Sequence, residues 1–216
     1  MCFSASASFV AATISGTAGA ICLARVRYRG DLLLAAIPLV FAVQQTIEGF
    51  LWQSLEHEGL SERSAALTAA FLMLTLVLWP VYAPLATFLA EPDRRRCLWV
   101  WAFLAAGLSV AAYFFMSLDA FPRTASIDGD HIVYSSHQGL PLLIRLFYPA
   151  ATSLSLMLSS HRMIAVSGVV IFIGSIVSYW MYWNAFTSVW CFFAAIASGL
   201  IILHFERARR ALPAQG

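Results

Sequence analysis

Seven stretches of this chain are each long and apolar enough to cross a lipid bilayer as a helix. A spanning helix needs about 20 mostly apolar residues. Of the 216 residues, 61% are hydrophobic and only 11% are charged, whereas a soluble domain carries about 25% charged residues. This composition excludes a soluble enzyme, a disordered chain and a nucleic-acid-binding protein. We expect an all-α integral membrane bundle with spans at 8–26, 32–54, 65–90, 98–118, 140–160, 163–183 and 186–206.

The arginines predict how this bundle is oriented. All 13 basic residues are arginines, and ten of them fall in alternate connections and in the tail: Arg25, Arg27, Arg29, Arg94, Arg95, Arg96, Arg162, Arg207, Arg209 and Arg210. Positively charged residues in short connections stay in the cytoplasm. We therefore expect an N-terminus outside, a cytoplasmic C-terminus, and one transmembrane domain over 1–216 with a cytoplasmic tail at 207–216.

The longest connection, 119–139, is expected to lie outside the membrane. Within it, Asp128-Gly129 separates two short runs of strand-forming residues, a pattern typical of a β-hairpin. Such a hairpin would cap the outer mouth of the bundle. Two other connections, at 160–162 and 183–185, are short enough to require tight turns.

Small residues and prolines indicate close and interrupted helix packing. Ser8, Ala12, Gly16 and Ala20 recur every four residues in the first span, which favours close approach of a second helix backbone. Prolines inside the second, third and fifth spans predict kinks with freed carbonyl groups: Pro38, Pro80, Pro84 and Pro149.

Polar residues form one layer in the outer half of the predicted bundle. In the second span, Gln44, Glu48 and Trp52 share one helical face because they are four residues apart. Glu48 lies about six residues, or roughly 9 Å, from the outer end of its span. Other spans contribute further residues at a similar depth, and the whole layer comprises Gln44, Gln45, Glu48, Trp52, Arg145, Tyr148, Trp190 and Cys191. We expect Glu48 and Arg145 to form an ion pair inside the bundle.

Two interpretations of this layer stay open. In the first, the ion pair satisfies itself and the glutamines join neighbouring helices. In the second, the layer lines a water-filled pocket open to the outside, which binds a small polar solute, a proton or a metal ion.

Cys2 adds a separate hypothesis, because removal of Met1 would leave it at the N-terminus. Its amine and thiolate could hold a transition metal ion together with Cys191, Glu48 or His131. The alternatives are a nucleophilic thiol, a disulfide with Cys191 and an inert buried thiol.

Several motifs together resemble an uncharacterised family of bacterial multi-pass membrane proteins. They are the start Met1-Cys2-Phe3-Ser4-Ala5, the segment from Gln44-Gln45 through Glu48-Gly49 to Trp52, Trp79-Pro80, Glu91-Pro92, Ser159-Ser160-His161 and the run from Val189 to Phe193. The resemblance implies a location in the bacterial inner membrane. It transfers no catalytic residue.

These observations predict a membrane protein whose outward-facing polar pocket binds a small solute or ion, with transport as the associated activity. Two alternatives remain. One is a membrane-embedded enzyme that depends on Cys2 or on a metal ion. The other is an accessory subunit of a larger membrane complex or homo-oligomer, in which the small-residue faces contact partner helices. The expected partners are the lipid bilayer and the solute, with no nucleic acid.

Overall fold

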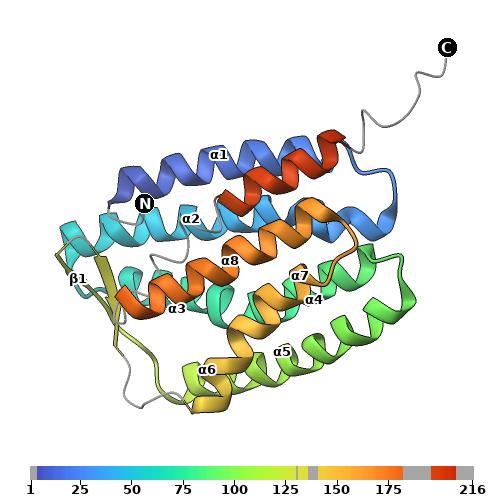
Figure 1. The fold of residues 1–216 in the computed structure, drawn as a ribbon. Coiled ribbons are helices and arrows are strands. Elements are labelled where there is room, and N and C mark those ends of the chain that lie inside the picture. The colour runs from blue at the N-terminus through green and yellow to red at the C-terminus, as the bar shows by residue number, and fades with distance from the viewer. Residues whose placement is uncertain (1–3, 130, 136–140, 182–195, 208–216) are drawn as a thin grey trace.

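The computed structural model describes residues 4–129, 131–135, 141–181 and 196–207. These residues form a bundle of long helices with a β-hairpin at one end (Figure 1). The elements, in chain order, are α1 (Ala5–Leu23), the short 3₁₀ helix η1 (Arg29–Asp31), α2 (Leu32–Glu58), α3 (Glu62–Leu72), the π-helix η2 (Met73–Leu78), α4 (Trp79–Ala90), α5 (Arg94–Ala120), β1 (Ala125–Asp128), β2 (His131–Tyr134), α6 (Leu142–Pro149), the π-helix η3 (Ala150–Leu154), α7 (Ser155–Met157), α8 (Arg162–Met181) and a helix over 196–207.

Local sequence signals mark where the long helices begin and end. The Ser4 side chain accepts a hydrogen bond from the backbone N–H of Ala7 and so caps α1. Ser61 and Ser64 form a reciprocal capping box at the start of α3. Gly59, with a φ of 64°, ends α2 in a backbone conformation that suits glycine.

Four helical stretches are long and apolar enough to cross a membrane: Ala5–Leu23, Arg29–Glu58, Glu62–Ala90 and Arg94–Ala120. The fifth and sixth predicted spans appear as shorter apolar helices, Leu142–Met157 and Arg162–Val177, and a tight turn joins them as expected. The predicted turn at 183–185 and the first half of the seventh span lie outside the described residues. Many large apolar side chains, among them Ile14, Leu98 and Met116, are exposed, which is the pattern of a surface that faces lipid.

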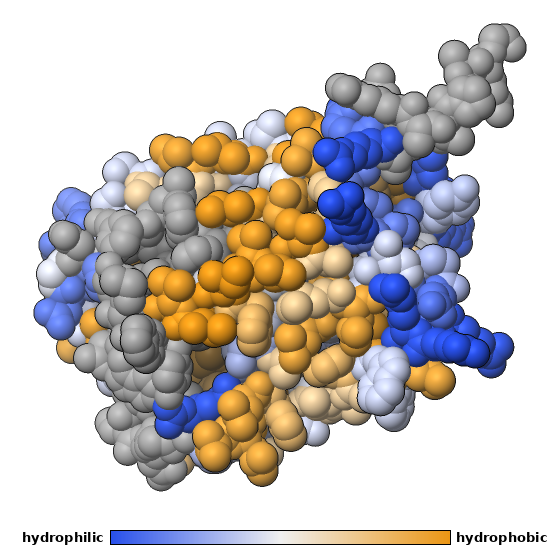
Figure 2. Space-filling view, in the orientation of Figure 1, coloured by the Kyte–Doolittle hydropathy of each residue, from blue (hydrophilic) through white to orange (hydrophobic). Residues whose placement is uncertain are grey.

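The two ends of the bundle differ in charge. We call the end that holds the turns at 24–31, 91–96 and 158–162 the arginine-rich end, and the opposite end the hairpin end (Figure 1). Figure 2 shows hydrophilic residues gathered at the arginine-rich end and a broad apolar band beside them. Of the arginines that the structure describes, Arg63, Arg123 and Arg145 lie towards the hairpin end and the other eight at the arginine-rich end.

The hairpin forms where the Asp-Gly pair predicted it. Strands β1 and β2 pair antiparallel, with Asp128 opposite His131, and Gly129 has a φ of 57° in the turn. Ala125 and Ile132 are buried beneath the hairpin against Leu51 of α2. The hairpin is therefore docked on the end of the bundle and does not project from it.

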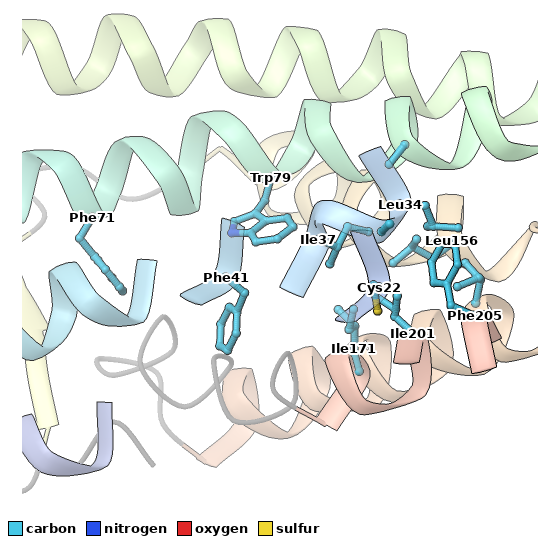
Figure 3. Packing of buried hydrophobic residues seen from close by; sticks show 14 of the residues in the cluster. Cys22, Leu34, Ile37, Phe41, Phe71, Trp79, Leu156, Ile171, Ile201 and Phe205 are labelled. Carbon is cyan, nitrogen blue, oxygen red and sulfur yellow. The ribbon is translucent and has the colours of Figure 1, made fainter. Parts of the chain in front are cut away.

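The main core brings together helices that are far apart in the sequence. Ile37 of α2, Leu156 of α7, Ile171 of α8 and Ile201 of the last described helix belong to one buried cluster (Figure 3). Helix α1 packs on α2 through its glycines. A Cβ added to Gly19 would lie 2.7 Å from the backbone nitrogen of Leu39.

Both π-helices are associated with prolines that cannot donate a backbone hydrogen bond. In η2, the Trp79 N–H donates to the carbonyl of Leu74, five residues earlier. The Thr75 carbonyl would then need the N–H of Pro80, which proline lacks. The Tyr148 hydroxyl donates to it instead, at 2.6 Å, so a side chain from α6 satisfies the group that Pro80 leaves free.

Candidate functional site

The polar face predicted on α2 is buried in the structure. The exposed fractions are 0% for Gln44, 1% for Gln45, 0% for Glu48 and 3% for Trp52. Helix α2 continues to Glu58, four residues beyond the predicted end. Glu48 therefore lies ten residues from the end of its helix, or about 15 Å along the axis at 1.5 Å per residue, deeper than the sequence suggested.

Hydrogen bonds join this face to a neighbouring helix. The Gln45 amide (Nε2) donates to Glu48 Oε2 at 3.0 Å. The indole N–H of Trp79, the first residue of α4, donates to Gln44 Oε1 at 2.5 Å. The layer is thus a cross-helix network that starts from consecutive glutamines on α2, one facing Glu48 and the other facing α4.

Three buried polar atoms in the same region have no hydrogen-bond partner: Trp52 Nε1, Ser8 Oγ and Ser15 Oγ. Both serines lie on α1, which packs along α2: Gly16 faces Ala42, and Phe9 contacts Gly49. A buried polar group without a partner costs about 1–3 kcal/mol. These atoms are therefore groups that a bound solute or water would satisfy.

The hairpin packs against this layer at Trp52. Trp52 belongs to one buried cluster with Leu51, Ala125 and Ile132. Tyr134 of β2 stacks on Phe71 of α3, with ring centroids 5.4 Å apart and planes 10° apart. The sequence expectation that the hairpin caps the bundle matches this packing.

Arg145 lies elsewhere than expected. It is half-buried on α6, a short helix that packs on α5 and η3, while α2 lies across the bundle (Figure 1). Among the side chains that the structure describes, the ion pairs are Arg25–Glu206, Arg63–Glu58 and Arg96–Asp93. The ion pair expected between Glu48 and Arg145 is not among these pairs of described residues.

The remaining predicted site residues divide into two groups. Cys2, Trp190 and Cys191 lie outside the described residues, so their roles as ligands stay predictions. His131 is half-buried on β2. In the described ranges no three His, Cys, Asp or Glu residues come together as a metal site would require.

A small cavity lies on the arginine-rich side of the Gln44–Trp79 contact. Its volume is about 30 Å³, enough for one water molecule. Apolar side chains form most of its wall, and its other lining residues include Thr152, Ser167 and Ser198. Trp79 lines it and also bonds Gln44, so one side chain separates the polar layer from the cavity.

Two aromatic residues make contacts that the sequence analysis did not predict. Trp79 bonds Gln44 of the polar layer, and Tyr148, expected only as a member of that layer, bonds the interrupted helix η2. A signal for the second was present in the sequence, because Pro80 inside a span predicts a freed carbonyl that needs a donor. No signal identified which tyrosine supplies it.

No curated protein and no solved structure matches the chain. A family model, described as a family of unknown function (DUF6629), matches residues 1–216. The resemblance drawn from the motifs to an uncharacterised family is thereby confirmed. The chain belongs to this family of unknown function, DUF6629.

Proposed function

We propose that this chain is a seven-span protein of the bacterial inner membrane that binds a small polar solute or ion around Glu48 and transports it. The four long apolar helices and the exposed apolar side chains support placement in a membrane. The concentration of arginines at one end supports a cytoplasmic position for that end. The hairpin end, with the N-terminus, then faces outside.

The observation that carries the proposal is the full burial of the Glu48 side chain in an apolar helix. A carboxylate inside a bilayer costs at least about 2.5 kcal/mol on insertion scales, and such residues mark pathways for protons or ions. The Gln45 amide donates a hydrogen bond to Glu48 Oε2 at 3.0 Å and so orients the carboxylate. A buried carboxylate held in this way suits a proton or a cation as its ligand.

Neighbouring groups suit a ligand that also accepts hydrogen bonds. The Trp52 indole N–H and the Ser8 hydroxyl are buried donors without partners. A hydrated cation or a polar solute offers oxygen atoms for them. The docked hairpin would exclude bulk water from the site, which strengthens each of these interactions.

Labelling with dicyclohexylcarbodiimide tests the site. This apolar reagent reacts with protonated carboxyl groups in apolar surroundings. We expect modification of the α2 peptide that carries Glu48, slower modification at high pH, and none in Glu48→Gln. The control is Glu56→Gln, because Glu56 is exposed on the same helix; it should label as the wild type does. Wild-type protein that stays unlabelled contradicts the proposal.

Transport is tested in vesicles of reconstituted protein with a pH-sensitive dye inside. After an external pH jump, with sodium present in one series and absent in the other, wild-type vesicles should change internal pH faster than protein-free vesicles in at least one series. Glu48→Gln vesicles should match protein-free vesicles. Equal rates for wild type and Glu48→Gln would refute a role for this carboxylate in transport.

A further inference from the structure

We propose that a recess at the arginine-rich end, formed by residues 24–27, binds the phosphate group of an anionic phospholipid. This inference rests on the membrane placement proposed above and is independent of the Glu48 site. The recess is open, has a volume of about 280 Å³ and is lined by Ala24, Arg25, Val26 and Arg27.

The two arginines of the recess differ in their ionic contacts. Arg25 is held by an ion pair with Glu206 of the last described helix, and both side chains are about one-quarter exposed. This contact fixes the guanidinium at the wall of the recess. Arg27 is exposed and makes no ion pair with any side chain in the described ranges. One cation is therefore positioned, and the second is available for an anion.

Two acidic residues at the arginine-rich end, Glu91 and Asp93, already have partners. Glu91 accepts hydrogen bonds from the backbone N–H groups of Ser160, at 2.7 Å, and Asp93, at 3.1 Å. The Asp93 side chain faces Arg96 at 3.7 Å. Glu91 and Asp93 are thus engaged, and the arginines outnumber the acidic residues at this end, which Figure 2 shows as hydrophilic.

Exposed aromatic residues set the level of the recess relative to a membrane. Trp99 and Trp101, near the start of α5, are 67% and 59% exposed. Tryptophan is enriched where lipid tails meet headgroups. Trp99 and Trp101 follow the arginines at the start of α5 by one to two helical turns. The arginine-rich end, which contains the recess, therefore lies at the depth of the lipid headgroups.

The ligand chemistry follows from the guanidinium group. Its planar array of N–H donors binds phosphate oxygens through paired hydrogen bonds, and it carries a permanent charge. A phosphate from a lipid fits better than a free anion, because the arginine-rich end lies beside the apolar band (Figure 2). An acyl chain could extend along that band while the phosphate occupies the recess.

The test measures thermal unfolding of the full chain in a neutral detergent as phosphatidylglycerol is added. We expect saturable stabilisation, absent with phosphatidylcholine and with inorganic phosphate at the same concentration. Arg27→Ala should weaken the apparent affinity about fivefold, the factor that corresponds to one arginine near an anionic surface.

Arg95→Ala is the matched control, since Arg95 is exposed at the same end but outside the recess. It should bind as the wild type does. Equal weakening by both substitutions would overturn the proposal in favour of diffuse surface charge. Equal stabilisation by phosphatidylcholine or by inorganic phosphate would overturn the assignment to an anionic lipid. Membrane placement itself is tested separately, because the protein should leave cell membranes only with detergent and not with high salt.

Discussion

Substitution of Gly107 by alanine should destabilise the bundle, because Gly107 of α5 lies directly against the backbone carbonyl of Pro80 in α4. A Cβ added to Gly107 would lie 1.8 Å from the Pro80 carbonyl oxygen and 2.8 Å from its carbon. Pro84 cannot donate to the Pro80 carbonyl, four residues earlier, so this oxygen faces α5 instead of closing a helical hydrogen bond.

The magnitude follows from the required separation of α4 and α5. Carbon and oxygen in contact lie about 3.3 Å apart or more, so the helices would have to separate by roughly 1.5 Å. Overpacking costs about 1–3 kcal/mol, and a backbone carbonyl cannot rotate away, which favours the upper value. Alanine recovers about 1 kcal/mol of helix propensity. The net loss is about 2 kcal/mol, or about 4–8 °C in Tm for a chain of this size.

The assay is thermal unfolding in detergent, followed with a thiol-reactive fluorescent probe. Cys22 is fully buried, so its reaction reports loss of the fold once the other three cysteines are replaced by serine in every variant. The control is Gly199→Ala, where no atom lies within 4 Å of the new Cβ; its Tm should stay the same or rise. If Gly107→Ala unfolds at the same temperature as Gly199→Ala, the proposed close contact between α4 and α5 is wrong.

Two further substitutions test other contacts. Tyr148→Phe should cost about 1–3 kcal/mol, because it removes the donor to the free carbonyl of η2; the exposed Tyr28→Phe should cost nothing, and equal Tm values for the two variants would contradict this role. Glu91→Ala should speed hydrogen exchange at the Ser160 amide about fivefold, the effect of losing a cap of about 1 kcal/mol. Unchanged exchange, or an equal change in Glu56→Ala, would show that Glu91 does not hold that turn.

Much of the candidate site followed from periodicity within one helix. Gln44, Glu48 and Trp52 were expected on one face, and all three are buried together. The small-residue stripe of α1 was only partly correct. Ser8 and Ala12 are buried, but Ala20 is exposed. A spacing of four residues advances about 40° around a helix at each step, so a stripe drawn at that spacing leaves the packed face after a few turns.

The pairing of Glu48 with Arg145 is where sequence reasoning was insufficient. Hydropathy gives the depth of a residue along its helix, but not the rotation of the helix or its neighbours. Arg145 lies on a helix that packs against α5, while Glu48 has Gln45 beside it. The partner of a buried charge depends on packing between helices, which no single span encodes.

The sequence by itself determined the helical class, the four long apolar helices, the arginine asymmetry and the Asp-Gly hairpin, because these depend on local composition and spacing. The tertiary structure alone decided that Trp79 bonds Gln44, that Tyr148 satisfies the Thr75 carbonyl, and that the hairpin covers Trp52. Each of these contacts joins residues more than 30 positions apart. They exist only because the helices pack in one particular order and rotation.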